Sequence, residues 1–480
     1  MRPLLSNSYV EFKDGQLPRG PLPSGLFVFI GPGDGTAIDG KLTPVSSPNE
    51  IAKLFGIGLL ARDLTTFFLE GAGFAYAIQL PASTVGSVGA LTVGQFTGLT
   101  ASATVRGEWD CRGRITLGGA LGAAQIKYSL DGGRTWGPSQ VLRTGANEIV
   151  GPGNFRTGLS ITPTAKTYVL DTAGDSEVST QEFEFSTTAP SVSDSEIIDA
   201  MTSVVTDPSV FVSGFHVSHR SASSLAAEAF AASVATVLSV AESTWFKYLY
   251  AILQAPADAT DAASTLAFVS SLRAAFTNSR VQFVSMPAIV KSMGGQFDMN
   301  LSPVICARRA MLAPQNDLGI VAAGQLLSVV SFSPGWDTSG VIGVDQLKNS
   351  VTIRKHVGAA GFYPTNGWMT DPSSDYSADK FRLVADLVAS DVRTIGVRFV
   401  KIDVDPSDVE VSIQPLLDAC KGPCDSRVKS KQASAISLTV PPNQNILVDK
   451  EVVVEVSIVP MGSADWIRFN VGFQSPFVGG

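Results

Sequence analysis

The chain has 480 residues, 45% of them hydrophobic and only 16% charged, and a formal net charge of −8. This length exceeds that of one ordinary domain. Lysine and arginine form no cluster that would bind phosphates, which argues against direct nucleic-acid binding. No apolar run approaches the ~20 residues of a membrane span, and the N-terminus lacks a signal-peptide run, so no membrane insertion is expected. A surface so poor in charge indicates extensive burial in an assembly.

The first part of the chain alternates strand and helix signals. Residues 1–24 are polar, contain LPRGPLP, and predict an extended arm without a core of its own. LFVFI at 26–30 predicts a buried strand. SPNE at 47–50 predicts a helix start, because serine caps, proline occupies the first helical position and glutamate follows the cap by three residues. A second helix and a strand at 74–80 complete the first part of a core domain, residues 25–83.

Helical periodicity disappears over residues 84–188, where short alternating runs rich in Gly, Thr, Ser and Val predict an inserted all-β domain, a small sandwich. Within it, SLDGGRTW at 129–136 matches the Asp-box pattern SxDxGxTW, in which aspartate and glycine shape a hairpin turn and the tryptophan packs beneath it. A propeller would repeat this pattern, and this chain carries it once. A structural β-hairpin is therefore the favoured interpretation, with carbohydrate contact as the alternative.

Strands and helices alternate again over residues 189–350, which predicts a mainly parallel sheet covered by helices on both faces. Its strands are expected at 210–217, 246–253 and 280–286. Residues 351–480 form the last part, with an amphipathic helix at 374–393, a strand at 395–404, a short helix at 407–420 and alternating β-runs at 450–460 and 465–473. The predicted fold class is α/β (α+β) and multi-domain, with a mixed-sheet core, an inserted all-β domain and extended terminal arms.

No motif of the chain supports catalysis, a metal or a cofactor. GPGDG at 31–35 lacks the third glycine of a dinucleotide loop and no helix opens directly after it, so we interpret it as a turn. His216 and His219, three residues apart at a strand end, would point to opposite faces, and zinc needs further ligands. Neither a GxSxG motif nor a paired-carboxylate site stands out. We therefore expect no enzyme activity and no cofactor.

Two short clusters have structural interpretations. Cys420 and Cys424, in CKGPC, have loop spacing and lack a second pair, and the scarcity of cysteine indicates a reduced, cytoplasmic protein. Asp403, Asp405 and Asp408 form an acidic run that lacks the calcium-loop pattern. The simplest interpretation of this run is a loop with a helix cap at its end.

Both ends of the chain carry short runs suited to strand pairing. At the C-terminus a strand could begin with Trp466. One of its faces would be wholly apolar and would carry Ile467, Phe469, Val471 and Phe473. In the N-terminal arm the only clustered β-formers are Tyr9, Val10 and Phe12. Such segments cannot fold alone but can add to an existing sheet edge. We expect them to contact neighbouring subunits, with pairing inside their own subunit as the alternative.

Four stretches resemble the contractile tail sheath proteins of phages and phage-derived particles. The first, at 26–80, joins a strand, GPGDG, the helix start PVSSPNEIAKLFG and EGAG before a strand. The second, at 168–200, is similar to the exit from an inserted β-domain in phage tail proteins. The third is FYPTNGWMTDPSSDYSADKFRLVADL within 362–393, and the fourth is the pair of C-terminal β-runs ending in DWIRFNVGF. The order of the four stretches along one chain is a stronger signal than any one stretch alone.

The resemblance implies a structural subunit that forms hexameric rings stacked helically around an inner tail tube. It also implies contacts with baseplate and tail terminator proteins, assembly in the bacterial cytoplasm and contraction without a nucleotide. Terminal arms would add strands to neighbouring subunits, and residues 351–480 would form the inner domain. Asp403, Asp405 and Asp408 would then face the tube. The alternatives are another phage-type tail or baseplate protein with a carbohydrate-contacting insert, and a cryptic hydrolase.

Overall fold

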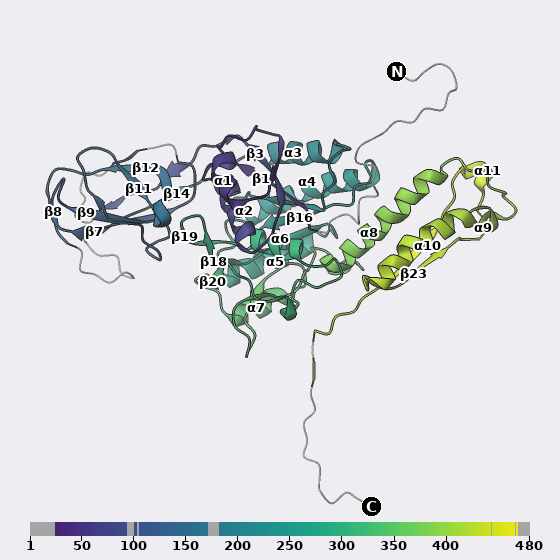
Figure 1. Cartoon of the computed structure of the whole chain (residues 1–480). Coiled ribbons are helices and arrows are strands. Elements are labelled where there is room, and N and C mark those ends of the chain that lie inside the picture. The colour runs from purple at the N-terminus through teal and green to yellow at the C-terminus, as the bar shows by residue number, and fades with distance from the viewer. Residues whose placement is uncertain are drawn as a thin grey trace, which may run out of the picture. The chain divides into compact units, whose positions relative to one another are not determined.

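The computed structural model describes residues 25–93, 100–102, 105–170, 182–442, 444–465 and 467–468 (Figure 1). The chain divides into two compact units, which we call unit 1 (up to Arg382) and unit 2 (from Leu383 onward). Unit 1 contains a parallel-rich sheet with helices and a separate set of antiparallel strands, and unit 2 contains helices and a β-hairpin. The predicted α/β class with mixed sheets is confirmed.

Six strands form the central sheet of unit 1: β1 (Phe27–Pro32), β2 (Leu42–Val45), β3 (Ala75–Leu80), β15 (Gly214–Val217), β16 (Tyr250–Gln254) and β17 (Val281–Val284). Their order is β17-β16-β15-β1-β3-β2. All neighbours pair in parallel except β2, which is antiparallel to β3. Every residue of β1 and β15 is buried, as expected for strands covered on both faces.

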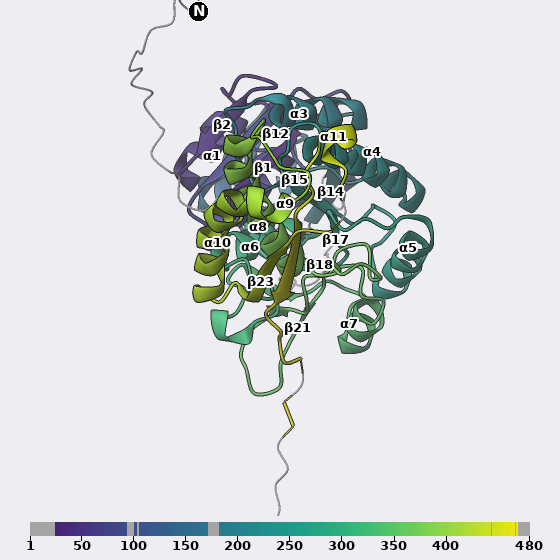
Figure 2. The ribbon, with the colours of Figure 1, turned by 90° about the vertical axis from the view of Figure 1, so that its right-hand side faces the viewer.

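Five helices cover this sheet: α2 (Leu59–Leu69), α3 (Asp194–Thr206), α4 (Ser224–Ser243), α5 (Ala262–Ala275) and α6 (Ser302–Met311). Helices α2 and α6 contact each other and cover the face that carries Phe29 and His216. Helices α3, α4 and α5 cover the opposite face (Figures 1 and 2). On this face Phe268 of α5 packs on Phe283 of β17 at a centroid distance of 5.4 Å.

A local signal in the sequence placed helix α1, and helix α4 stands out by its hydropathy. Helix α1 (Pro48–Phe55) begins with the predicted capping box, in which Ser47 Oγ accepts a hydrogen bond from Asn49 N and Glu50 Oε1 accepts one from Ser47 N. Among the described helices, α4 has the length and hydropathy of a membrane span, but 44% of that window is buried inside the structure. Leu225, in the first turn of α4, is 77% exposed.

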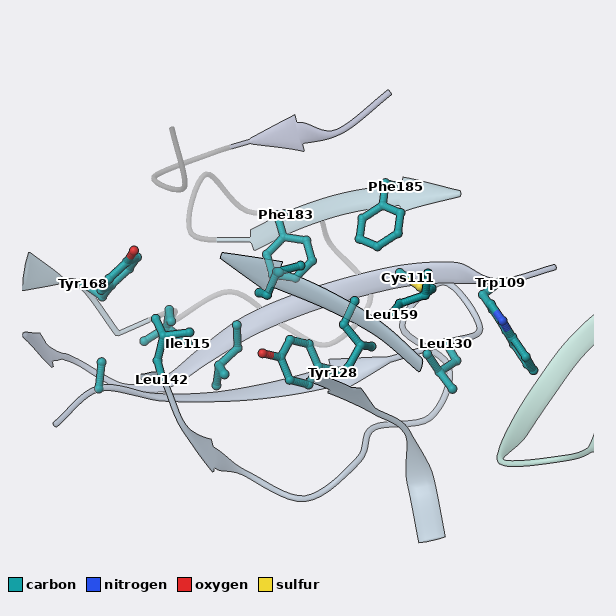
Figure 3. Close-up of a cluster of buried hydrophobic side chains, with 14 of the residues drawn as sticks. Trp109, Cys111, Ile115, Tyr128, Leu130, Leu142, Leu159, Tyr168, Phe183 and Phe185 are labelled. Atoms are coloured by element: carbon teal, nitrogen blue, oxygen red, sulfur yellow. The ribbon is translucent and has the colours of Figure 1, made fainter. Parts of the chain in front are cut away.

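The antiparallel strands of the insert are β4 (Ser87–Val88), β5 (Thr92–Val93), β6 (Thr100–Ser102), β7 (Asp110–Leu117), β8 (Gly119–Ala120), β9 (Gln125–Ser129), β10 (Gln140–Val141), β11 (Asn147–Val150), β12 (Arg156–Thr162), β13 (Thr167–Tyr168) and β14 (Glu182–Thr188). They form one sheet in the order β10-β9-β7-β14-β4, with β5 paired to β14, and the smaller sheets β11-β12-β6 and β13-β8. Figure 3 shows the side chains between them, among which Trp109, Tyr128 and Phe183 are buried.

Outside the insert, unit 1 contains another small sheet, which the sequence did not predict. Its strands are β18 (Pro287–Ser292), β19 (Gly295–Asn300) and β20 (Val329–Phe332), in the order β19-β18-β20. Strands β18 and β19 form a hairpin whose turn contains Gly294, with a φ of 70°. Unit 1 also contains α7 (Thr338–Asp345), β21 (Ile353–Arg354) and β22 (Tyr363–Pro364).

Unit 2 corrects two expectations. Helix α8 (Asp379–Gly396) crosses the unit boundary and is followed by the 3₁₀ turn Val397–Phe399, so the strand predicted at 395–404 is wrong. Residues 395–404 are all described and none of them lies in a strand, and Val397 and Val400 are exposed. The helix predicted at 407–420 is two helices, α9 (Val409–Ser412) and α10 (Gln414–Lys429). Unit 2 also contains β23 (Ala433–Thr439), α11 (Ile446–Asp449) and β24 (Glu455–Pro460).

Candidate assembly interface

The β23–β24 hairpin is the sheet of unit 2, and within the described residues it has two strands. The two strands pair antiparallel from Thr439↔Glu455 to Ala433↔Pro460, with one irregularity. One face carries half-buried aliphatic side chains: Ile436, Leu438, Val456 and Ile458. The other face is exposed and mostly polar. A two-stranded ribbon is marginally stable in water, and its outer edges are templates for further strands.

Helix α10 packs against β23 and supports the hairpin (Figure 2). Its buried side chains are Cys420, Cys424 and Arg427, spaced as one helical face. The loop predicted for CKGPC is therefore wrong, since this stretch continues the helix through Pro423. Arg427 donates to both carboxylate oxygens of Asp391 on α8, at 2.8 and 3.2 Å, and thereby joins α10 to the part of α8 that belongs to unit 2.

The acidic run lies in an exposed loop before α9, as predicted. Asp408 caps that helix by accepting a hydrogen bond from Val411 N at 3.3 Å. Asp405 accepts hydrogen bonds from the hydroxyl and the amide of Ser407, which hold the pKa of its carboxyl below the usual value. Asp403 is exposed as well. The structure thus presents all three carboxylates to solvent.

Exposed aliphatic side chains flank the acidic loop in the sequence, and two more lie on α11. Val397, Val400 and Val411 are 57%, 68% and 67% exposed, and Leu447 and Val448 on α11 are 74% and 72% exposed. Exposed aliphatic side chains suit contacts with other proteins. Unit 2 therefore offers two features suited to such contacts: a sheet with two strands among the described residues, and exposed aliphatic side chains.

The predicted terminal contact residues fall mostly outside the described part of the chain. These are Tyr9, Val10, Phe12, Trp466, Phe469, Val471 and Phe473. Ile467 is described, is 73% exposed, and belongs to no strand. The role of both termini therefore stays a prediction.

In unit 1, the turn at 129–136 forms the predicted hairpin between β9 and β10 and also holds the insert to the core. Asp131 is buried and accepts hydrogen bonds from Thr135 N and from Gln296 N of β19, each at 2.8 Å. Phe297 of β19 belongs to the hydrophobic core of the insert, with its ring centroid 5.5 Å from that of Trp109. The sequence pattern located the turn, but nothing in it indicated this second contact.

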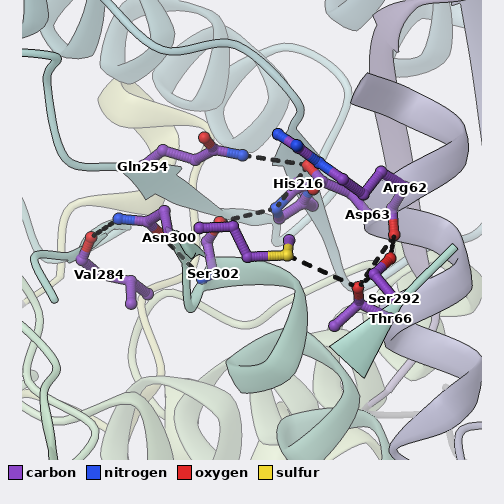
Figure 4. A network of polar contacts seen from close by, with 10 residues as sticks. Arg62, Asp63, Thr66, His216, Gln254, Val284, Ser292, Asn300 and Ser302 are labelled. Carbon is purple, nitrogen blue, oxygen red and sulfur yellow. Dashed lines mark hydrogen bonds and ion pairs between the residues drawn. The ribbon is translucent and has the colours of Figure 1, made fainter. Parts of the chain in front are cut away.

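A buried polar network lies between the central sheet and helices α2 and α6 (Figure 4). Asp63 Oδ2 accepts a hydrogen bond from Gln254 Nε2 at 3.0 Å and lies 3.9 Å from His216 Nε2, which is 2.9 Å from Ser302 Oγ. Burial raises the pKa of Asp63 to about 6 and lowers the pKa of His216 to about 3. Because His216 is fully buried, no solute reaches its ring. The described residues contain no His, Cys, Asp or Glu group suited to a metal ion.

The fold of this chain is similar to that of chains in solved structures of contractile assemblies. A chain of the PVC sheath complex, an extracellular contractile injection system in its contracted state, is 9% identical and aligns over 98% of this chain and 98% of its own, with a TM-score of 0.52. A chain of the anti-feeding prophage baseplate in its contracted state is 12% identical over 98% of this chain and 99% of its own, with a TM-score of 0.51. The sheath tail protein of Desulfitobacterium hafniense is 13% identical over 95% of this chain and 100% of its own, at a TM-score of 0.49.

The sequence itself places the chain in a family. The family model described as DUF2586, N-terminal domain, matches residues 8–368, well over half of the chain. The chain therefore belongs to the DUF2586 family. Comparison with curated proteins gives no match.

Proposed function

We propose that this chain is a structural subunit of a contractile tail sheath, which polymerises as stacked hexameric rings around an inner tube and contracts to drive the tube through a target envelope. The observation that carries the proposal is the fold, which is shared over nearly the whole chain with a chain of a sheath complex. The energy of contraction would come from better packing between subunits in the contracted state. The subunit would act without catalysis, cofactor or nucleotide, in a particle assembled in the bacterial cytoplasm.

The connections between subunits would form at the β23–β24 hairpin. Its open edges and half-buried face suit the addition of strands from neighbouring subunits. The candidates for those strands are the terminal runs around Tyr9–Phe12 and 466–473. Main-chain hydrogen bonds would supply the link, and the apolar side chains of the arms would set the register.

Further partners would be the inner tail tube, the baseplate and the tail terminator. The exposed loop with Asp403, Asp405 and Asp408 is our candidate for the tube contact, because its carboxylates are solvent-facing and next to exposed aliphatic residues. The β insert would lie on the outside of the particle, since an inserted domain needs space in a packed tube. An insert deletion that still assembles would support this placement, provided that Phe297 is changed to serine, because the deletion uncovers that ring.

Electron microscopy of the purified full-length chain tests the proposal. We expect tubular polymers built from stacked rings. Single subunits or closed rings that never stack would contradict it and would favour a baseplate role, to which the similarity with a baseplate chain also points. Removal of residues 1–20 should abolish the polymers and leave the melting temperature of the monomer unchanged. A truncated chain that still builds normal tubes would exclude the arm as a connector.

A further inference from the structure

A cavity of about 490 Å³ lies where the β insert meets the β18–β19 hairpin of unit 1. The insert lines it with Thr135, Pro152 and Phe155, and the hairpin lines it with Lys291 and Gln296. Sites for small molecules typically have volumes of roughly 300–1,000 Å³ and often lie where two domains meet. The cavity therefore has the size and the position of a small-molecule site.

One wall of the cavity is aromatic and lies beside bare backbone. Phe155 is half-buried, and its ring centroid is 5.5 Å from that of the buried Trp109, which holds the ring in place. Glycines also line the cavity and place no side chain in it: Gly153, Gly294 and Gly295. At Gly294 a Cβ atom would lie only 2.9 Å from Phe155 Cβ. This wall therefore leaves space for the apolar face of a ring-shaped ligand.

The polar groups of the cavity come mostly from the hairpin. Lys291 and Gln296 are directly opposite each other in the register of β18 and β19, so their side chains project from the same face. In the part of the chain that the structure describes, neither Lys291 Nζ nor the side-chain amide of Gln296 has a hydrogen-bond or ion-pair partner. Thr135 Oγ1 donates to Asp131 Oδ2 at 2.5 Å, which leaves its lone pairs free to accept. The cavity thus offers an ammonium, an amide and a hydroxyl acceptor.

The negative charge beside the cavity is already satisfied. The buried carboxylate of Asp131 accepts hydrogen bonds at both oxygens from donors within the protein: Ser129 Oγ, Thr135 N, Thr135 Oγ1 and Gln296 N. The Lys291 side chain, in contrast, is exposed at the rim. Its ammonium is therefore available to pair with an anionic group of a ligand.

We propose that this cavity binds a uronic acid, that is, a sugar that carries a carboxylate. The apolar face of the sugar ring packs on Phe155, and the carboxylate pairs with Lys291. The hydroxyl groups bond to the Gln296 amide and to Thr135 Oγ1. A ring with several hydroxyls and one negative charge matches a cavity with one aromatic wall, one free cation and neutral polar groups. The inference goes beyond the proposed sheath function and does not depend on it, because binding needs only the single chain.

Saturation-transfer NMR with the full-length chain tests the proposal. The probes are the methyl glycosides of glucuronic and galacturonic acid, each beside its neutral counterpart, methyl glucoside or methyl galactoside. We expect at least one acidic sugar to bind at millimolar concentrations, and its neutral counterpart to bind about tenfold more weakly because it lacks the contact with Lys291. Binding of neither acidic sugar would overturn the proposal. Displacement by inorganic phosphate or acetate at equal concentration would also overturn it, because the site would then bind any anion.

Variants of the cavity locate the binding. Lys291→Ala should weaken the acidic sugar about tenfold and leave the neutral sugar unchanged, and Lys291→Arg should restore the preference. Gln296→Ala should weaken both sugars about fivefold, because it removes a contact with a hydroxyl group. Lys53→Ala, at an exposed lysine of α1, is the control and should change nothing. Thermal melts confirm that each variant is folded, and equal affinity of folded Lys291→Ala and the native chain would contradict this site.

Discussion

The β insert of unit 1 and the β-hairpin of unit 2 are both built from alternating strands, but they differ in how their apolar side chains are covered. In the insert, Trp109, Tyr128 and Phe183 are at most 2% exposed, because several sheets and the core residue Phe297 enclose them. In the hairpin, the aliphatic face of β23 and β24 is half-buried and Val459 is 54% exposed. The insert thus completes its core inside the subunit, whereas the hairpin needs further strands for full burial.

The largest expected effect is in the core of the insert. Phe183→Ala should destabilise the insert by about 3–5 kcal/mol, because the large cavity cannot collapse among closely packed aromatic residues. Ile458→Ala in the half-buried face of the hairpin is the matched change and should cost about 1 kcal/mol in the unassembled subunit. Denaturant titrations, monitored by hydrogen exchange at amides of the insert and of the hairpin, measure both losses of stability. Similar losses in the two regions would contradict the difference in burial.

A smaller effect is expected where the insert meets the core. Asp131→Ala should cost about 2–3 kcal/mol, because it leaves buried amide donors without acceptors. Hydrogen exchange at the Gln296 amide should accelerate, since that amide donates to Asp131. Asp425→Ala, an exposed carboxylate on α10, is the control and should leave exchange unchanged. If the Gln296 amide kept its protection in Asp131→Ala, the junction would not depend on this contact.

The stability of unit 1 should also depend on pH through the buried pair of Asp63 and His216. Asp63 has a folded pKa of about 6, above its usual value, so its contribution to stability is present at low pH and is lost as pH rises through 6. His216 has a folded pKa of about 3, so its contribution is present above pH 6.5 and is lost as pH falls below that value. The two effects oppose each other between pH 4 and pH 6.

Substitution of either residue separates the two effects. In His216→Gln the remaining Asp63 effect should make the chain more stable as pH falls from 6 to 4, relative to the native chain. In Asp63→Asn the remaining His216 effect should make it less stable over the same range. Denaturant midpoints measured across this range provide the test, and two variants with the same pH profile would show that this pair does not control it.

The smallest effect on the subunit is expected at the acidic loop. Joint change of Asp403, Asp405 and Asp408 to lysine should lower the melting temperature of the monomer by only a few degrees, because the three side chains are exposed and the loss is limited to about 1 kcal/mol for the α9 cap that Asp408 supplies. The same change should weaken co-assembly with the tube at low salt, where charges are least screened. Unchanged co-assembly at low salt would show that the acidic loop does not contribute to the contact with the tube.

What the sequence predicted depended on whether the signal was local. Ser47 and Glu50 form the expected capping box because both partners lie within one turn. The pattern around Asp131 was also local and predicted a turn. The hydrogen bond from Gln296 N to Asp131 joins residues far apart in the chain, and no sequence pattern indicated it. The strand predicted at 395–404 failed because apolar alternation gives no information on whether a partner strand exists. Strand β23 was missed although ISLTV alternates, since its apolar face is only half-buried.

Hydrogen exchange of the assembled and unassembled full-length chain tests the central claim most directly. If neighbouring subunits complete the hairpin, the amides of Ala433–Thr439 and of residues 455–459 should exchange quickly in the monomer and become protected in the polymer. The amides of the insert should be protected equally in both states. A hairpin already protected in the monomer, or one that stays unprotected in the polymer, would contradict the account.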